Sequence, residues 1–439
     1  MQELLGSLTI CARVPDPIAE SALKKVRWRL IPFLFLLYIV AYLDRVNVGF
    51  AAIDMNRDLG FSAAVYGLGS GIFFLSYTLL EVPSNLMLAR VGARIWIARI
   101  MFTWGLLSSA MIFVDGPARF YLIRFLLGAA EAGFFPGVIL YLTQWFPQRE
   151  RARAVGLFMT ATAMAGVIGA PISSALLRFD GVWGLRGWQW LFLIEGIPAV
   201  LLAPVVLTYM TERPADAKWL SADEREWLAR EMTAEQSLSA QSHTTLRAAL
   251  ISGRLWALSS VYLCVVVAFY GISFWLPQIV QSMSSLGSAT IVLLSAIPYV
   301  AATAGLVVIG ARSDRARERR WHVAVPCLIG ATGFVLTVLL PATPAVALTT
   351  LSIAAFGIWG TLGPFWAMPT ALLRGTAAAG GIALVNSIGN VGGFAGPYLM
   401  GWIRDATGGF TAGLLTLAAI LVAGAVIVLR LQQPEERRI

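Results

Sequence analysis

Charged side chains are scarce in this sequence. They make up 13% of its 439 residues, whereas hydrophobic residues make up 58%. An ordinary soluble domain has about 25% charged and about 45–50% apolar residues. The composition therefore excludes a typical soluble domain and indicates a protein that lies within a lipid bilayer. Polar and apolar residues do not alternate at period two either, which argues against a membrane-spanning barrel of strands.

Cysteine and histidine are also rare, at three and two residues. Cys11, Cys264 and Cys327 are scattered along the chain, so we expect no disulfide framework. His243 and His322 fall in polar segments, which leaves proton transfer within the membrane to carboxylates. No cluster of metal ligands and no pair of nucleophile and base stands out. We therefore expect no enzyme activity, no metal and no cofactor.

Long apolar runs account for most of the chain. Each is close to the ~20 residues that a helix needs to cross the hydrocarbon core of a bilayer. We predict an all-α membrane protein with twelve transmembrane helices in two halves of six. The predicted spans are 30–50, 63–86, 95–114, 118–141, 152–177 and 188–210 in the first half, and 256–279, 289–311, 321–340, 346–369, 377–400 and 410–430 in the second.

The longest polar stretch, 211–253, separates the two halves. Within it, Ser221 and Glu224 have the spacing of a capping box, which predicts the start of a short helix. Short basic loops after the second and eighth spans suggest that the halves are structural repeats. We divide the chain into an N-terminal segment (1–29), a first six-helix half (30–210), a central loop (211–253), a second six-helix half (254–431) and a tail (432–439).

The net charge of +9 follows from membrane topology, and we expect no nucleic-acid partner. Most lysines and arginines fall in segments on the side of the N terminus, among them Lys24, Lys25, Arg27 and Arg29. The positive-inside rule then places both termini and the central loop in the cytoplasm. Residues 1–24 lack an apolar core and a cleavage site, so we expect no cleaved signal peptide.

Two pairs of opposite charges lie inside predicted spans. Asp44 and Arg45 are adjacent in the first span, and Arg124 and Glu131 lie in the fourth. A charge at the bilayer centre costs roughly 2.5–3.5 kcal/mol, so these side chains must face partners or a wet cavity. Arg124 and Glu131 are about 10.5 Å apart along a helix axis, too far to pair directly. We expect Asp44 to face Arg124, with Glu131 as a second titratable carboxylate; a static structural network is the alternative.

Other polar and aromatic residues in the spans are candidates for binding. Asn386 and Asn390 are one turn apart in the eleventh span. An amide in hydrocarbon needs a partner, so we expect these two to bind oxygen atoms of a substrate. We expect Tyr42 and Tyr77 to line the same cavity and Trp366 to close it, although aromatic residues in spans more often pack in the core or at the interface.

Two further carboxylates, Glu81 and Glu195, lie in the second and sixth spans. We interpret both as helix-packing or gate residues. Contact with a substrate or a proton is the alternative for each of them.

Five segments resemble the major facilitator superfamily and, within it, the anion:cation symporter family. The resemblance extends over roughly residues 24–431, and all five segments occur in the family's order. Family members carry tartrate, sugar acids or aromatic carboxylates, typically together with protons. The segments are YLDRVNVGFA (42–51), RFLLGAAEAGFFPG (124–137), GWQWLFLIEGIPA (187–199), YGISFWLPQIV (270–280) and NSIGNVGGFAGPYLMGW (386–402).

This resemblance implies roles for individual residues. Asp44 and Glu131 match the family's proton-binding carboxylates, so that protons serve as the coupling ion. Arg45 matches the arginine that binds the substrate anion, and Arg124 matches the partner of the first-span aspartate. The positions that line the family's substrate cavity are matched by Tyr42, Tyr77 and Asn390.

The chain departs from the superfamily in the loop after the second span. Ala89 stands where the superfamily usually has an aspartate. We therefore expect a cytoplasmic gate to depend on Arg90 and Arg94, together with Asp314 and Arg315 in the matching loop of the second half.

The residues and the resemblance together predict a monomeric secondary transporter in a bacterial inner membrane. It would take up a small organic anion by proton symport, with alternating access around a midplane site. Two alternatives stay open: a facilitator or anion exchanger for the same substrates, and a membrane receptor that binds its ligand without moving it.

Overall fold

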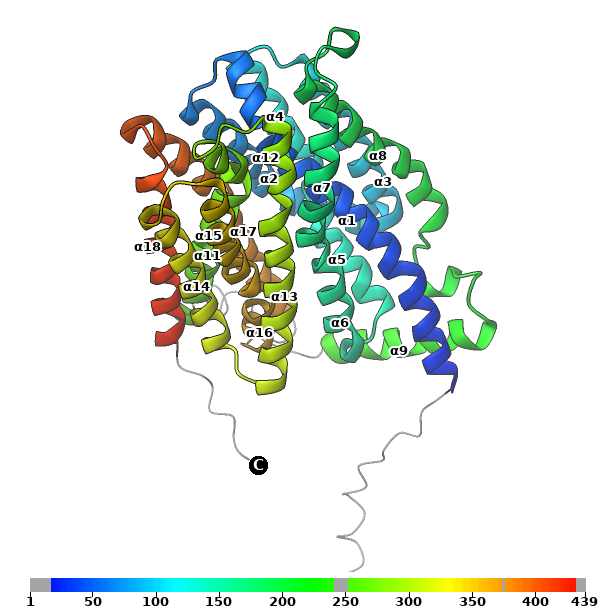
Figure 1. Cartoon of the computed structure of the whole chain (residues 1–439). Coiled ribbons are helices and arrows are strands. Elements are labelled where there is room, and N and C mark those ends of the chain that lie inside the picture. The colour runs from blue at the N-terminus through cyan, green and yellow to red at the C-terminus, as the bar shows by residue number, and fades with distance from the viewer. Residues whose placement is uncertain (1–16, 241–251, 373–375, 432–439) are drawn as a thin grey trace, which may run out of the picture.

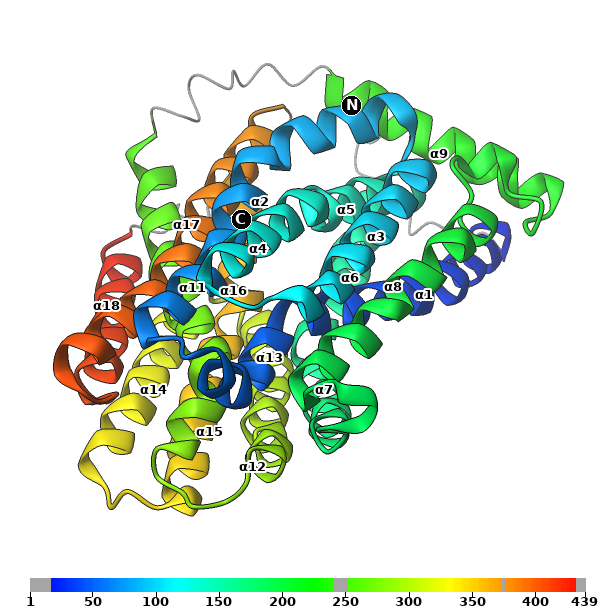
Figure 2. The same cartoon turned by 90° about the horizontal axis from the view of Figure 1, so that it is seen from above.

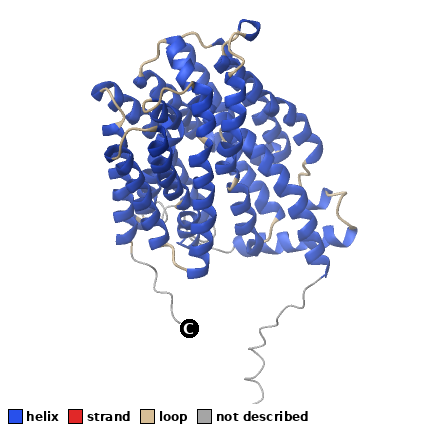
Figure 3. Cartoon of the chain, viewed as in Figure 1, coloured by secondary structure: helices blue, strands red, loops and turns tan. Residues whose placement is uncertain are grey.

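The computed structural model describes residues 17–240, 252–372 and 376–431, and most of these residues are helical (Figure 1, Figure 3). The long helices stand side by side in one bundle, as their apolar composition predicts. The predicted tail 432–439 and the first sixteen residues of the N-terminal segment lie outside the described residues, as do Cys11 and His243.

The first part of the bundle contains the helices up to residue 209. Its longest member, α1, extends well beyond the predicted span at both ends. These helices are α1 (Pro17–Leu59), α2 (Ala63–Val91), α3 (Ala93–Ser109), α4 (Pro117–Glu131), α5 (Phe134–Trp145), α6 (Gln148–Met159), α7 (Ala161–Leu177) and α8 (Gly187–Tyr209).

The second part begins at residue 253. Its helices are α11 (Gly253–Gln281), α12 (Ser288–Leu294), α13 (Ala296–Ala316), α14 (Arg320–Leu339), α15 (Pro344–Gly360), α16 (Leu362–Leu372), α17 (Thr376–Thr407) and α18 (Thr411–Arg430). Viewed from above, the helices up to α8 and the helices from α11 onward occupy opposite sides of the bundle (Figure 2). We call these two sets of helices the first and second halves.

Eleven helical stretches in the described part of the chain are long and apolar enough to cross a membrane. Eleven of the twelve predicted spans coincide with them. The remaining span, 377–400, forms α17, which is not among the eleven. Its asparagines and many glycines lower its hydropathy, so its crossing of the membrane stays a prediction.

The two halves meet along a few helix pairs. α2 packs against α17, α1 against α11, and α7 against α12 and α13. Glycine allows α2 and α17 to approach closely, because a Cβ atom on Gly401 would lie 2.2 Å from the carbonyl oxygen of Ala63. Within each half the outer helices pair in the same way, α3 with α8 and α14 with α18. This correspondence agrees with the predicted repeat.

A short helix, α9 (Ala222–Ala240), lies across one end of the bundle, where α1 begins and α18 ends (Figure 1). We call this the terminal end and the opposite one the far end. The predicted capping box is confirmed: the backbone N–H of Glu224 donates to Ser221 Oγ at 3.2 Å, and that of Ser221 donates to Glu224 Oε2 at 2.8 Å. Glu224 also accepts hydrogen bonds from Ser21 and Lys25 of α1. It therefore attaches α9 to the start of the bundle.

Candidate functional site

Asp44 and Arg45 lie in the middle of α1 and face different neighbours, since successive residues on a helix point about 100° apart. The Asp44 carboxylate faces α3. It accepts hydrogen bonds from Trp104 Nε1 at 2.6 Å and from Ser108 Oγ at 2.8 Å. Asn47, one turn along α1, donates a third at 3.3 Å. The buried charge is thus held by neutral donors.

Arg45 faces the contact between the two halves. Its guanidinium pairs with Glu131 at the end of α4. It also donates to the hydroxyl of Tyr270, on α11 of the second half, at 3.3 Å. The ring of Tyr77 lies 5.3 Å from the guanidinium carbon. Arg45 and Glu131 are only 7% and 1% exposed, so the pair is almost fully removed from solvent.

Arg124 does not pair with Asp44, and that prediction is wrong. Its guanidinium donates to the backbone carbonyl oxygens of Gly69 and Ser70, at 3.3 and 3.2 Å. These carbonyls come within reach because α4 lies directly against α2: a Cβ atom on Gly128 would be 2.0 Å from the carbonyl oxygen of Phe73. Arg124 therefore fixes α4 to α2, on a side of the bundle where Asp44 does not point.

Glu131 is placed by a break that the sequence analysis did not predict. The predicted fourth span is two helices, and α4 ends at Glu131 itself. Gly133 then has a φ of +88°, a left-handed conformation that glycine adopts most easily. Ser84 on α2 donates to the carbonyl oxygen of Ala132 at 2.5 Å and stabilises the break. The sequence does carry a signal for this break, because a glycine followed closely by a proline, here Gly133 and Pro136, is typical of a helix end.

Asn386 and Asn390 on α17 are partly exposed, and both are bonded to a carboxylate of the protein. They donate hydrogen bonds to the two carboxylate oxygens of Glu81 on α2, at 2.7 and 3.2 Å. These bonds join the two halves. Glu81 lies one turn from Tyr77 on the same helix. The sequence analysis interpreted it as a packing or gate residue, with contact to a substrate or a proton as the alternative.

The predicted aromatic residues also lie near the middle of the bundle. Tyr42 is buried against Tyr38 and Phe269, and in the described part of the chain its hydroxyl has no hydrogen-bond partner. Trp366 is partly exposed and meets the ring of Tyr262 edge-on, with ring centres 4.9 Å apart. The second predicted packing carboxylate, Glu195, accepts from Ser173 at 2.5 Å and stays within the first half.

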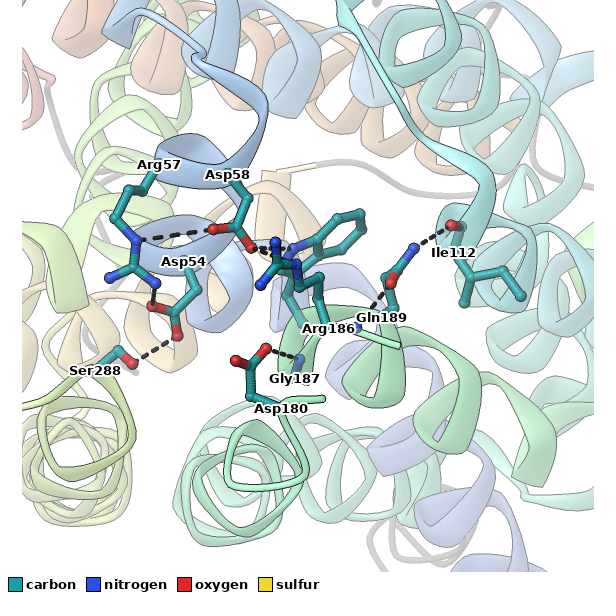
Figure 4. A network of polar contacts seen from close by, with 10 residues as sticks. Asp54, Arg57, Asp58, Ile112, Asp180, Arg186, Gly187, Gln189 and Ser288 are labelled. Carbon is teal, nitrogen blue, oxygen red and sulfur yellow. Dashed lines mark hydrogen bonds and ion pairs between the residues drawn. The ribbon is translucent and has the colours of Figure 1, made fainter. Parts of the chain in front are cut away.

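The far end of the bundle is closed by polar contacts between the halves. Asp54 on α1 accepts a hydrogen bond from Ser288, at the start of α12, at 2.6 Å (Figure 4). The same figure shows Arg57 between Asp54 and Asp58, with nitrogen–oxygen distances of 2.8 and 3.8 Å. Asp58 in turn accepts from Trp188 at 3.1 Å.

A second far-end contact joins α17 to the start of α2. The carboxylate of Asp405 accepts hydrogen bonds from the backbone N–H groups of Ala63 and Ala64, at 3.0 and 2.8 Å. An acidic side chain at a helix N terminus is electrostatically favourable. Asn56 also donates to Gln278 across the halves at 3.3 Å.

The predicted gate residues lie at the terminal end, and the structure does not bring them together. Asp314 pairs with Arg319 of its own half at 2.7 Å. Among the described residues, no ion pair joins Asp314 to Arg90 or Arg94, and both arginines are exposed. The far end is thus latched, whereas these gate residues are apart.

A helical membrane bundle of two repeated halves, with buried charges where they meet, defines a secondary transporter. The chain matches the family model of the Major Facilitator Superfamily over residues 34–394, and it belongs to that superfamily. It is a multi-pass membrane transporter and not an enzyme, as the sequence predicts.

Individual relatives are similar over nearly the whole chain. It is 50% identical over 420 residues to a protein of Agrobacterium vitis named "Putative tartrate transporter", covering 95% of this chain and 96% of that protein. It is 41% identical over 409 residues to a quinolone resistance transporter of Acinetobacter baumannii, covering 93% and 94%.

Solved structures share the fold. One is a bacterial homologue of the human lysosomal transporter Spinster in an inward-facing, occupied conformation. It matches with a TM-score of 0.74 and 19% identity, covering 92% of this chain and 96% of that one.

Proposed function

We propose that this transporter takes up a small organic anion across a bacterial inner membrane together with protons. The observation that carries the proposal is the buried pair of Arg45 and Glu131, which contacts Tyr270 where the halves meet. A guanidinium offers planar, two-point pairing to a carboxylate and stays charged. The similarity to a protein named for tartrate supports an organic acid as the substrate.

Proton coupling follows from competition for Arg45. While Glu131 is ionised it occupies the guanidinium and repels an incoming anion. A proton on Glu131 removes that charge and frees Arg45 for a substrate carboxylate. Anion and proton then favour the same state of the protein, which is sufficient for coupling.

Asp44 would bind the second proton. Its carboxylate accepts from the indole N–H of Trp104, a group that can only donate, and from Ser108. Protonation leaves fewer acceptor sites for these donors, so it alters the contact between α1 and α3. In this role Asp44 acts on the first half, without touching the substrate.

The closed far end supports alternating access. With both termini in the cytoplasm and α17 crossing the membrane as the eleventh of twelve spans, the latched far end faces the outside. The conformation described is then closed toward the outside and corresponds to an inward-facing state. Return to the outward state needs Arg90 and Arg94 to meet Asp314 and Arg315 at the terminal end.

Proteoliposomes provide the test. Adding tartrate, sugar acids or aromatic carboxylates outside should acidify the lumen for one acid only. The Glu131→Gln variant should reduce acidification but keep counterflow of the same acid, and Arg45→Lys should weaken its binding by tenfold or more, about 1.4 kcal/mol. Arg119→Lys, at an exposed surface pair with Asp115, serves as the matched control.

Two outcomes would reject parts of the proposal. Acidification that is unchanged in both Glu131→Gln and Asp44→Asn would remove the proton roles of these two residues, and counterflow of one acid without any acidification would leave exchange or facilitated transport. The similarity to a quinolone resistance transporter favours export as a second candidate. In vesicles of known orientation, accumulation of the substrate only when the lumenal pH is lower than the external pH would establish export.

A further inference from the structure

Glu81 is a buried carboxylate that has no role in the transport mechanism proposed above. It lies on α2 and is 6% exposed. Both of its oxygen atoms are engaged by amides from the other half: Asn386 donates to Oε1 at 2.7 Å and Asn390 to Oε2 at 3.2 Å. Together these bonds form a two-point carboxylate-binding arrangement.

The contact differs from ordinary helix packing in where its partners lie. Glu195, the other buried carboxylate assigned to packing, bonds to a serine of its own half. Among the described residues, Glu81 bonds only across the halves, and these bonds must change when the halves move. The two asparagines are partly exposed, while Glu81 is buried behind them. A ligand can therefore approach the amides from the side that Glu81 does not cover.

The middle of the bundle thus has two places that suit an anionic oxygen. One is the guanidinium of Arg45, on the first half. The other is the pair of amides on the second half. A carboxylate of the protein occupies each of them, Glu131 in the first and Glu81 in the second.

We propose that Glu81 is a placeholder: it holds the amides of Asn386 and Asn390 while the transporter is empty, and it releases them to a carboxylate or hydroxyl oxygen of the substrate. Glu81 is thus a positioning residue that acts through the asparagines. The inference rests on the proposed function, since it assumes that an organic acid binds between the halves.

A placeholder lowers the apparent affinity, because only the fraction of molecules with free amides can bind fully. In Glu81→Gln, one of the two acceptor oxygens becomes an NH2 group and the charge is gone, so the side chain holds the two amides more weakly. Tartrate should bind ~5–10-fold more tightly to this variant than to the wild type. Turnover should fall at the same time, because the amides then hold the substrate without a competitor.

The experiment measures equilibrium binding of tartrate, and of the other acids proposed above, to purified protein, together with KM and kcat in proteoliposomes. Glu195→Gln is the matched control, because it neutralises a carboxylate of similar burial within one half, and it should leave the dissociation constant within about twofold. If the Glu81→Gln variant does not fold, Glu81→Ala serves as the second variant that removes the carboxylate.

The asparagines provide the decisive comparison. In a protein that already carries Asn386→Ala and Asn390→Ala, adding Glu81→Gln should change tartrate affinity by less than about twofold. If the variant still binds more tightly there, Glu81 acts by bulk charge and the placeholder role is rejected. Weaker binding by Glu81→Gln alone would also reject it, since Glu81 would then only order the amides. If neither wild type nor variant binds any acid, the proposed function itself fails.

Discussion

The pair of Arg45 and Glu131 allows a quantitative prediction. Removing one partner of a buried ion pair leaves the other charge uncompensated, which costs about 3–5 kcal/mol. Both side chains are nearly inaccessible, so Arg45→Gln and Glu131→Gln should each lower the free energy of unfolding by about that amount. The double variant leaves no charge behind. It should lose less than the sum, with a coupling energy of at least about 2 kcal/mol.

The assay is reversible unfolding of the purified protein in mixed micelles, followed by the fluorescence of its 15 tryptophans. A second cycle, Asp44→Asn with Arg124→Gln, is the reference. These two residues have different partners in the structure. Their effects should therefore add to within about 0.5 kcal/mol.

The reverse pattern would refute this pairing. Additive effects for Arg45 and Glu131, with strong coupling between Asp44 and Arg124, would restore the crossed arrangement expected from the sequence. It would also remove the competition for Arg45 on which proton coupling depends.

Two further predictions concern stability. Burial opposes the charge of Glu224, but donors led by Lys25 outweigh it and lower its pKa from 4.5 to about 2. Its stabilising contribution is therefore complete above pH 4.5 and is lost as the pH falls toward 2; the unfolding midpoint should fall over that range, and less steeply in Lys25→Gln. At the break after α4, Gly133→Ala should destabilise the protein by about 2–3 kcal/mol, from left-handed strain of about 1–2 kcal/mol plus overlap with Ser84. Gly60→Ala has the same left-handed strain but open space around it. An equal loss of stability in both variants would therefore show that overlap with Ser84 contributes nothing.

Sequence alone could predict most of the fold, because the apolar spans are long and the bilayer fixes their length. The second span, predicted at 63–86, is found as Ala63–Val91, and Ser62 caps it as a side-chain acceptor. The capping box at Ser221 could also be predicted, because both of its partners lie within four residues. Local patterns of this kind do not depend on how the helices pack.

The break at Gly133 and the partners of the buried charges could not be predicted in the same way. The charges of Asp44, Arg45, Arg124 and Glu131 allow several pairings at comparable depth. The choice between them depends on the rotation of each helix and on how closely α4 approaches α2. That approach is set by Gly128, whose missing side chain lets Arg124 reach backbone carbonyls instead of a carboxylate.

Residues without an unusual pattern were missed for a related reason. Trp104 and Ser108, one turn apart in the third span, support Asp44, but tryptophan and serine are unremarkable in a membrane helix. Tyr270 lies in one of the five family segments, and only the fold shows that it reaches Arg45. Glu81 stood out as a buried charge, but its partners are 305 and 309 residues away in the chain.

The contacts between the halves fall into two chemical kinds, and this division suggests the order of events in transport. At the far end, Asp54 and Asp405 accept from a hydroxyl and from backbone N–H groups, which a substrate in the middle of the bundle does not touch. In the middle, Arg45 donates to Tyr270 and Asn386 donates to Glu81 across the halves, and a substrate oxygen can take over these donors. A substrate bound in the middle can therefore act directly only on the middle contacts. The far-end latch must open as a consequence of helix movement, so replacing Asp405 should change how often the transporter faces outward and leave the groups that contact the anion in place.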